Sequence, residues 1–398
     1  MRIGIAVIID KTTALDYIIN QSDKDLIARY GNTYGIPAVN TLIHSFIEAG
    51  HFIRIFTLAQ KEFVIKTPKI EIYAVKFFDK YPVKYLWGGF NNAHRLKTLM
   101  KSKLADLDVL HAHWTYDCAY AASSYASQMP IFCTVRDIAP YIWSVVSLKD
   151  KITWTFRLYM NNLVFRNRQI HFIANSPYTA SAIKNKCKVE IPIIPNSIKN
   201  SFIKQDEHIY PSQFKILCIS SGNGKRKNVI ALVKAFRIFR EKYPESSLRL
   251  IGIPFTDGNK VMEQWRKEGL LEQVELTGPV LHDKLTEYLD TCSVFITPSL
   301  EETFGNTLLE SIVRKVPVIG GKKSGAVPYV LHQGKAGYLC DVSQPKAIFQ
   351  TLEHVYLHPD EARQKANEAY HIILSEYKEE VVYQKHIELY RKYIHVNP

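Results

Sequence analysis

The sequence predicts an α/β protein built from two open, doubly wound parallel sheets. Short apolar runs alternate with longer amphipathic runs, which is typical of parallel strands joined by helical crossovers. The 398 residues, 46% of them hydrophobic, can form two cores of about 150–200 residues each. A polar stretch at residues 200–212 interrupts the alternation, which resumes at Phe214. We therefore expect one domain over residues 1–200 and a second over residues 213–375.

In the first domain, short apolar runs predict the strands. The first run stops at Asp10, so it is predicted to be a strand rather than a signal peptide. Apolar residues at helical spacing predict helices over residues 37–49 and 92–105. Residues 11–29 form an unusually long loop for which the sequence offers no explanation. The strands are expected over residues 2–9, 52–58, 70–75, 109–113, 131–135, 171–174 and 191–194.

The stretch from Ile296 to Glu310 is the most informative part of the chain. A buried strand is predicted over residues 292–297, and apolar residues recur at helical spacing after Gly305. A strand, a glycine-bearing turn and a helix start place backbone N–H groups and the positive end of a helix dipole at one point. We therefore predict a phosphate or pyrophosphate site at the amides of Gly305, Asn306 and Thr307.

Two glutamates flank this predicted anion site, Glu302 in the loop and Glu310 in the helix. Glu310 follows Asn306 by four residues, which is about one helical turn. Helical side chains lean toward the N-terminus, so Glu310 can point back over the helix start and accept hydrogen bonds from sugar hydroxyls. A capped surface helix with solvated glutamates is the alternative interpretation.

A second anion site is predicted after a strand over residues 214–220. A Gly-Asn-Gly turn there contains Asn223, and Lys225, Arg226 and Lys227 open the next helix. Cations at a helix start are unfavourable for a purely structural helix, but a bound anion offsets them. We assign Asn223, Arg226 and Lys227 to an anion site, with a solvated basic turn as the alternative.

These motifs resemble those of retaining glycosyltransferases with the two-domain GT-B fold, in particular the family-4 glycosyltransferases, over most of the chain. The Glu-x7-Glu spacing of Glu302 and Glu310 carries the resemblance. It implies two Rossmann-like domains that face an interdomain cleft. It also implies a C-terminal helix over residues 376–398 that crosses back to the first domain, within a charged tail predicted to be helical over residues 361–393.

The same resemblance implies roles for the predicted donor residues. Glu302 is expected to be catalytic and to face the donor sugar, Glu310 to bind the donor ribose, and Lys227 to grip the donor diphosphate. The arginine usual in the family falls on Gly222 here, so Arg226 or Lys225 is expected to substitute for it. No carboxylate is placed as a nucleophile, so we expect front-face substitution with retention of configuration.

The first domain is expected to bind the acceptor. His113 ends a predicted strand at the edge where open α/β sheets bind ligands, and the resemblance implies that it contacts the donor sugar as a catalytic residue. Arg136 at the next strand end suggests an anionic acceptor group, although a salt bridge to Asp137 explains it equally well. The segment from Gly31 to Gly35 resembles the family's glycine loop, so the acceptor residues are predicted to be Asn32, Gly35, Arg136 and Asp137.

No metal site is expected, and no cofactor besides the nucleotide-diphosphate sugar as co-substrate. Asp106 and Asp108 form a literal Asp-x-Asp pair, but they precede their strand, at the edge away from the ligand, where turn chemistry explains them. We expect His111 and His113 to point to opposite faces of their strand and so not to share a metal.

Composition limits the partners and the location. The net charge of +13 favours anionic partners: nucleotide-sugar phosphates, a lipid pyrophosphate, an anionic membrane or nucleic acid. Nucleic acid is disfavoured, because no zinc-finger spacing, RNA-recognition signature or long basic tail is present. Six scattered cysteines without a Cys-x-x-Cys pair indicate reduced thiols in the cytoplasm. Residues 149–168 interleave aromatic and basic side chains, typical either of a helix on the inner face of the membrane or of an ordinary surface helix.

The expected function is therefore transfer of a sugar to a saccharide or lipid-linked saccharide acceptor, in bacterial surface polysaccharide or glycolipid synthesis. A nucleotide-sugar 2-epimerase of the same architecture would act without an acceptor and use carboxylates for proton abstraction. A non-catalytic nucleotide-sugar binding protein would bind the donor without transferring or hydrolysing it. The spacing of Glu302 and Glu310 argues against the epimerase, whereas the donor loop does not separate the enzyme from the binding protein.

Overall fold

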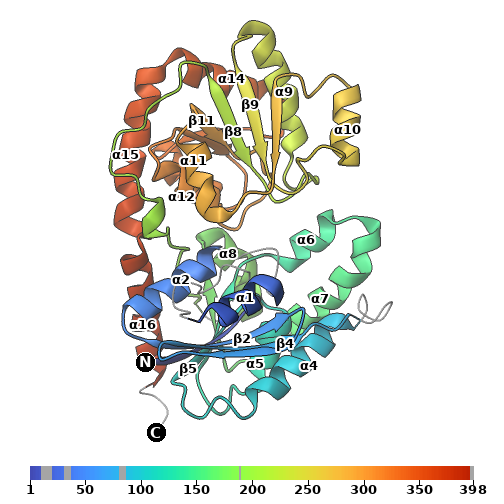
Figure 1. The fold of residues 1–398 in the computed structure, drawn as a ribbon, viewed down its shortest axis with the longest axis vertical. Helices are drawn as coiled ribbons and strands as arrows, with labels where there is room; N and C mark the ends of the chain where they lie inside the picture. The colour runs from blue at the N-terminus through green and yellow to red at the C-terminus, as the bar shows by residue number, and fades with distance from the viewer. Residues whose placement is uncertain (10–19, 31–36, 80–86, 188–189, 395–398) are drawn as a thin grey trace. The chain divides into compact units, whose positions relative to one another are not determined.

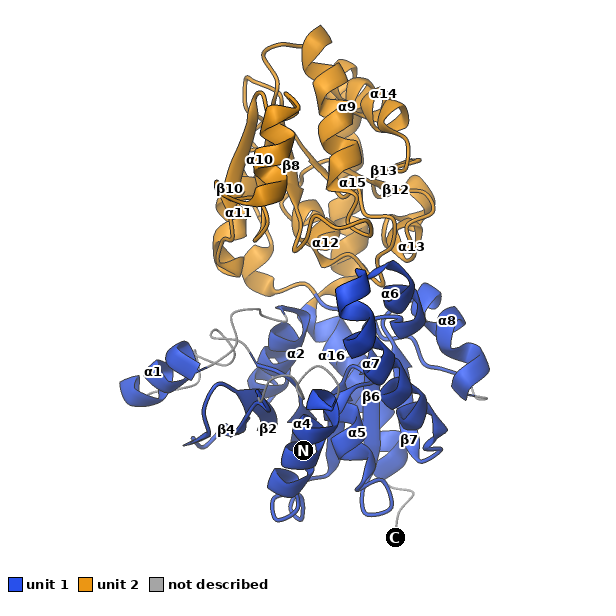
Figure 2. Cartoon of the chain, turned by 90° about the vertical axis from the view of Figure 1, so that its right-hand side faces the viewer, with its two compact units in different colours: residues 1–197, 379–398 blue, residues 198–378 orange. Residues whose placement is uncertain are grey.

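The computed structural model describes residues 1–9, 20–30, 37–79, 87–187 and 190–394. The chain divides into two compact units, of which unit 1 is Met1–Ser197 with Glu379–Pro398 and unit 2 is Ile198–Lys378 (Figures 1 and 2). Each unit is an α/β domain with its own parallel sheet, as the alternation of apolar runs predicts. The segment after Ser197 is not a bare linker. It forms a short 3-10 turn at Asn200–Phe202 and buries Phe202 and His208 in unit 2.

Among the described residues of unit 1, seven strands form a sheet in the order β3-β4-β2-β1-β5-β6-β7. All neighbouring strands are parallel except β3 and β4, which form an antiparallel edge. This order brings the carboxyl ends of β1, β5 and β6 next to one another. The strands are β1 (Arg2–Ala6), β2 (Phe52–Ala59), β3 (Phe63–Lys66), β4 (Ile70–Lys76), β5 (Val109–His113), β6 (Ile131–Val135) and β7 (Ile170–Ala174).

Two apolar clusters cover the two faces of this sheet. One packs α4 and α5 against it, and the other packs α2 and α16. The last helix is held on α2 by polar contacts too, since Glu379 lies 2.8 Å from His44 and 3.1 Å from Ser45. The helices of unit 1 are α1 (Gln21–Tyr30), α2 (Pro37–Glu48), α4 (Gly88–Met100), α5 (Asp117–Ser123), α6 (Ala139–Val145), α7 (Leu148–Arg166), α8 (Pro177–Cys187) and α16 (Glu379–Ile394).

Unit 2 contains a fully parallel sheet in the order β10-β9-β8-β11-β12-β13. Its strands are β8 (Lys215–Ile219), β9 (Ser247–Ile251), β10 (Val274–Gly278), β11 (Val294–Ile296), β12 (Val318–Gly321) and β13 (Tyr338–Cys340). Its helices are α9 (Val229–Lys242), α10 (Lys260–Lys267), α11 (Leu285–Leu289), α12 (Asn306–Ile312), α13 (Val327–Val330), α14 (Pro345–Leu357) and α15 (Pro359–Tyr377). Because β8 and β11 are direct neighbours, the loops that follow them meet at one sheet edge.

Several local expectations were wrong. Residues 191–194 do not form a strand and make only a bridge to Ala174, because prolines 192 and 195 remove two ladder donors. Residues 21–29 are not loop, since they lie in α1, which begins at Gln21 and buries Ile27. Residues 11–19 lie outside the described part. The charged tail is helical as predicted, but it is two helices that part at Lys378, whose backbone is extended.

The strand β3 was missed, because its four residues give too short an alternation to recognise. Over the described ranges, no helix is long and apolar enough to cross a membrane.

Candidate active site

The two predicted donor segments of unit 2 meet after β8 and β11. The main-chain N–H of Leu300 donates to the carbonyl of Arg226 over 2.8 Å. The amide of Asn228 donates to the carbonyl of Pro298 over 3.2 Å, with Asn228 itself in the left-handed region at φ 51°. These hydrogen bonds join the basic turn to the glutamate loop, although 75 residues separate the facing side chains of Lys227 and Glu302.

Lys227 and Glu302 form the central ion pair of this edge. The Nζ of Lys227 lies 2.5 Å from Oε1 of Glu302, and each side chain is only 16% exposed. Burial raises the pKa of the Glu302 carboxyl, but the charges of Lys227 and Arg226 outweigh it and hold that pKa below its usual value. The residue predicted to grip the diphosphate therefore already neutralises the residue predicted to face the donor sugar.

Glu301 is a site residue that sequence reasoning missed. Its carboxyl is almost fully buried, and Oε2 lies 3.4 Å from Nη1 of Arg226. Burial, opposed by Arg226 and reinforced by Glu302, raises the pKa of Glu301 to about 7. Arg226 also lies 3.9 Å from Glu302, so the arginine contacts both glutamates of this loop. Adjacent glutamates in a loop gave a sequence signal, but it did not show which of them is buried.

Gly305 begins α12 with φ at 97°, a left-handed conformation that favours glycine. Asn306 and Thr307 are the first two residues of α12, directly after this turn. Asn223 is half-buried in the preceding turn, beside the Ser220–Gly222 hydrogen bond. The structure thus gathers all seven predicted donor residues of unit 2 around the ends of β8 and β11.

Glu310 lies in α12 with only 5% of its surface exposed. Its Oε1 lies 2.9 Å from Nε2 of His282, whereas Oε2 is buried with no hydrogen-bond partner in the described part of the chain. Burial lowers the pKa of His282, but the charge and hydrogen bond of Glu310 outweigh it and the net pKa is raised. Sequence reasoning did not single out His282, which precedes Glu310 by 28 residues.

In unit 1, His113 lies at the carboxyl end of β5 and is completely buried. The prediction that His111 and His113 point to opposite faces was wrong. Their ring centroids are 4.3 Å apart, because residues two apart on a strand share a face. They still do not form a chelating pair, since both nitrogens of His111 are occupied by the hydroxyls of Tyr390 and Thr134.

Arg136 holds His113 in place. Its Nε–H donates to Nδ1 of His113 over 3.2 Å, which leaves the proton of a neutral imidazole on Nε2. That Nε2 is buried and has no hydrogen-bond partner in the described ranges. Arg136 also donates to Asn196 over 2.7 Å, and burial lowers its pKa to about 10. Asp137 accepts a hydrogen bond of 2.8 Å from the hydroxyl of Tyr116.

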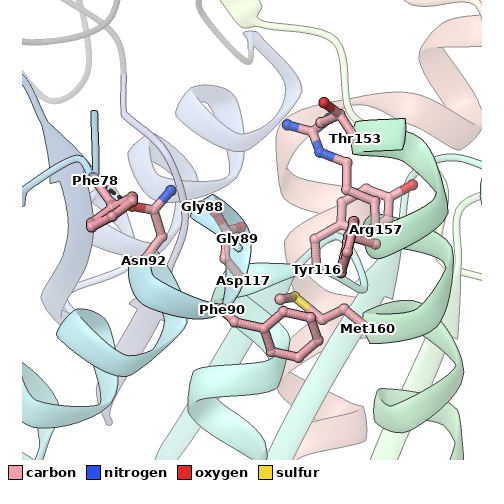
Figure 3. Close-up of a pocket in the computed structure, with 11 residues that line it drawn as sticks. Phe78, Gly88, Gly89, Phe90, Asn92, Tyr116, Asp117, Thr153, Arg157 and Met160 are labelled. Atoms are coloured by element: carbon pink, nitrogen blue, oxygen red, sulfur yellow. Dashed lines mark hydrogen bonds between the residues drawn. The ribbon is translucent and has the colours of Figure 1, made fainter. Parts of the chain in front are cut away.

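A small cavity of about 110 Å³ lies beside these groups in unit 1, between α4, α5 and α7 (Figure 3). Phe90, Phe156 and Tyr116 supply apolar walls, and Asp117 and Arg157 supply opposite charges. Burial raises the pKa of Asp117, and the charge of Arg157 opposes this. The other predicted acceptor residues, Asn32 and Gly35, lie outside the described residues.

No cluster of three or more metal-ligating side chains occurs within the described ranges. Asp106 pairs with Arg54 and Arg2, and Asp108 accepts from the main-chain N–H of Arg2 over 2.7 Å. These contacts lie at the amino end of β5, so the Asp-x-Asp pair is structural.

Two family models match the chain in succession. The model described as Glycosyltransferase Family 4 matches residues 38–201, and the model described as Glycosyl transferases group 1 matches residues 200–371. Among curated proteins, the N-acetyl-alpha-D-glucosaminyl L-malate synthase of Bacillus anthracis is 27% identical over 70% of this chain and 75% of its own length. The D-inositol 3-phosphate glycosyltransferase of Pseudarthrobacter chlorophenolicus is 28% identical over 39% of this chain, and the alignment spans 37% of that relative.

Solved structures share the fold over nearly the whole chain. A sucrose-phosphate synthase from Thermosynechococcus elongatus gives a TM-score of 0.78 at 17% identity, covering 99% of both chains. Anabaena HepE in complex with UDP and glucose gives 0.67 at 15% identity, covering 90% of this chain and 97% of HepE. An E. coli protein bound with UDP-2-fluoro glucose gives 0.72 at 10% identity, covering 98% and 99%.

Proposed function

The chain belongs to the family-4, group 1 glycosyltransferases of GT-B fold, which use nucleotide sugars, and we propose that it is a retaining, metal-independent transferase acting on a saccharide or lipid-linked saccharide. The observation that carries this proposal is the joined edge of unit 2. There, a buried lysine, a glycine-initiated helix and two glutamates eight residues apart meet at the ends of neighbouring strands. Unit 2 binds the donor, and unit 1 receives the acceptor.

On the donor side, binding exchanges one partner of Lys227 for another. The diphosphate takes Lys227 from Glu302, and the amides after Gly305 together with Arg226 add further donors to its oxygens. The released Glu302 carboxylate then accepts hydrogen bonds from donor-sugar hydroxyls, while Glu310 holds the ribose. Uridine diphosphate is the first nucleotide to test, because HepE and the E. coli structure carry UDP or a UDP sugar.

In the transfer step, the acceptor hydroxyl attacks the anomeric carbon on the face from which the diphosphate departs. The bond from that carbon to the diphosphate oxygen breaks, and the departing oxygen takes the hydroxyl proton. Lys227 and the α12 amides stabilise the negative charge that develops on the leaving group. The Nε2–H of His113 supplies a hydrogen bond to a sugar hydroxyl near the reacting carbon. Since His113 is fully buried, the atoms that cover it must move first.

The acceptor is proposed to bind at the strand ends of unit 1, with the cavity at Asp117 and Arg157 holding one sugar ring. Aromatic walls with a few polar groups are typical of small-molecule sites. Arg136 is half-buried next to His113, where it can serve an anionic acceptor group. Two of the relatives are named for anionic compounds, L-malate and D-inositol 3-phosphate. We place the product in bacterial surface polysaccharide or glycolipid synthesis.

A cytoplasmic protein with a lipid-linked acceptor has to approach the inner face of the membrane. The junction of α6 and α7 exposes 37% of Trp143, 88% of Leu148 and 54% of Ile152, beside Lys149 and Lys151. This surface is proposed to contact anionic lipids. Sedimentation with vesicles containing phosphatidylglycerol tests it, and Leu148→Ser should bind less than wild type. The control is Ile209→Ser, which alters a residue of unit 2 that is 81% exposed.

The function is tested first by thermal shift with UDP, GDP and ADP and their common sugars, for wild type and Glu310→Ala. One diphosphate should stabilise the wild type and not the variant, and EDTA should change nothing. If no nucleotide at millimolar concentration shifts the melting temperature, the donor assignment is wrong. Transfer to an added acceptor then separates the enzyme from a 2-epimerase, which needs none, and from a binding protein, which leaves the donor intact.

A further inference from the structure

We propose that His282 is a positioning residue for ribose recognition. It holds one oxygen of Glu310 and leaves the other for a hydroxyl of the donor ribose. This inference rests on the proposed donor site and adds a residue and a selectivity to it. The bound molecule would be a ribonucleoside diphosphate, discriminated from its deoxy analogues.

The geometry divides the two carboxylate oxygens of Glu310. Oε1 lies 2.9 Å from Nε2 of His282, and the glutamate side chain is 6% exposed. Oε2 is buried and lacks any hydrogen-bond partner among the residues described. A buried carboxylate oxygen without a partner is costly, so a ligand hydroxyl that supplies the missing hydrogen bond is bound favourably.

The direction of Glu310 agrees with this role. Helical side chains lean toward the N-terminus of their helix, and Glu310 is one turn after the start of α12 at Asn306. The proposed diphosphate site is at that start. A ribose attached to the diphosphate can therefore reach Oε2 while the phosphates contact the amides.

The position of His282 is fixed by its neighbours. Its ring packs on Phe202 with centroids 4.7 Å apart, and Arg314 donates to the carbonyl of Phe202 over 3.0 Å. The neighbouring Asp283 pairs with Lys199 at 3.2 Å. The first residues of unit 2 thus fix the histidine, the histidine fixes Glu310, and little reorganisation is left for ligand binding.

Ribose selectivity follows from the unpaired oxygen. A site built to hydrogen-bond a hydroxyl rejects an analogue that lacks it, because its buried polar group stays unpaired. Without His282, Glu310 can rotate and satisfy both oxygens elsewhere, so the penalty for a missing hydroxyl shrinks. The selectivity, rather than the affinity alone, therefore reports on His282.

The experiment is isothermal titration with UDP, 2′-deoxy-UDP and 3′-deoxy-UDP, or with the corresponding forms of whichever diphosphate stabilises the wild type. The proteins are wild type, His282→Ala, His282→Gln, Glu310→Gln and the double variant of His282→Ala with Glu310→Gln. The matched control is His354→Ala, since His354 contacts Glu361 at 3.2 Å on a distant exposed helix pair. Should His282→Ala not fold, His282→Asn, whose amide is too short to reach Glu310, takes its place.

Wild type should prefer the ribose form over at least one deoxy form by about tenfold or more. His282→Ala should lose about tenfold in affinity for the ribose form and most of that preference. His282→Gln, which keeps an N–H donor, should stay within about threefold of wild type. The alanine change should add little once Glu310 is glutamine.

Equal losses for ribose and deoxy forms in His282→Ala would overturn the inference and reduce His282 to a structural residue. So would a wild type that binds UDP without distinguishing its deoxy forms, which leaves the proposed donor site intact. A wild type that binds no diphosphate at all would instead overturn the proposed function, and this inference with it.

Discussion

The strand ends of the two units use opposite electrostatic designs. In unit 2 the site consists of charged side chains that neutralise one another, such as Lys227 with Glu302. Each of these side chains is at most 32% exposed. In unit 1, His111 and His113 are fully buried and joined by hydroxyl and guanidinium groups instead of carboxylates. Mutually paired charges can be exchanged for a charged ligand, whereas a buried network without carboxylates resists rearrangement. This difference agrees with the proposal that unit 2 binds the diphosphate and that unit 1 positions groups by shape.

Removing the central cation of unit 2 should have the largest effect. Lys227→Met is expected to lower kcat/KM by about 100–1000-fold, because the leaving diphosphate loses its cation and Glu302 loses its partner. Steady-state kinetics with the donor measure this. Lys242→Met is the control, since the Lys242 side chain is 60% exposed and pairs with Glu353 at 2.8 Å. A loss as small as that of the control would break the contrast between the two units.

The matching change in unit 1 should leave donor binding intact. His113→Gln is expected to lower kcat/KM by about 10–100-fold while the Kd of the diphosphate stays unchanged, because the proposed diphosphate site lies in unit 2. Calorimetry of UDP binding beside a transfer assay separates these quantities. His94→Gln alters an exposed histidine of the same unit and should be silent. Full activity of His113→Gln would mean that this residue serves only the core of unit 1.

Acid should destabilise unit 1 through its buried histidines. Burial lowers the pKa of His111, His113 and His386, that of His386 to about 3. In the unfolded chain these histidines bind protons below about pH 6.5, whereas in the folded protein they stay neutral. The free energy of unfolding is therefore at its full value above that pH and falls as the pH drops. For His386 alone the loss at pH 5 is about 2 kcal/mol.

Hydrogen-exchange mass spectrometry of unit 1 peptides between pH 8 and pH 5 follows this loss once the intrinsic exchange rates are corrected for. In His386→Leu, which removes one titrating ring, the slope with pH should be shallower. An unchanged slope would show that the cluster is already protonated in the folded protein.

The stability of unit 2 should change with pH in the opposite direction, because of Glu301. Its pKa is raised to about 7, so the protonated form is favoured in the folded state, and stability is lost as the pH rises from about 4.5 to 7. Glu301→Gln, which keeps the shape without the charge, should stabilise unit 2 by about 1–2 kcal/mol at pH 8 and by nothing at pH 4. Melting curves at both values test this, and equal effects at the two values would contradict the raised pKa.

Much of the fold could be predicted from the sequence, because most strands and helices are determined by the pattern of neighbouring residues. Strands such as β6 (Ile131–Val135) are buried along their whole length, and their continuous apolar runs mark them. The errors arose where a second factor intervened. Prolines removed ladder donors at residues 191–194, and α1 has too few apolar residues to show a helical period.

The strand, turn and helix of the predicted donor loop were recognisable from sequence alone, because they follow one another from Val294 to Ile312. That contiguous geometry depends on neighbouring residues and on the spacing of Glu302 and Glu310. Tertiary structure alone decided which atoms remain available. Tyr390 reaches His111 across 279 residues, Arg226 meets Glu301 across 75, and His282 occupies one oxygen of Glu310. Burial and charge at such contacts are set by segments that only folding brings together, and no local pattern encodes them.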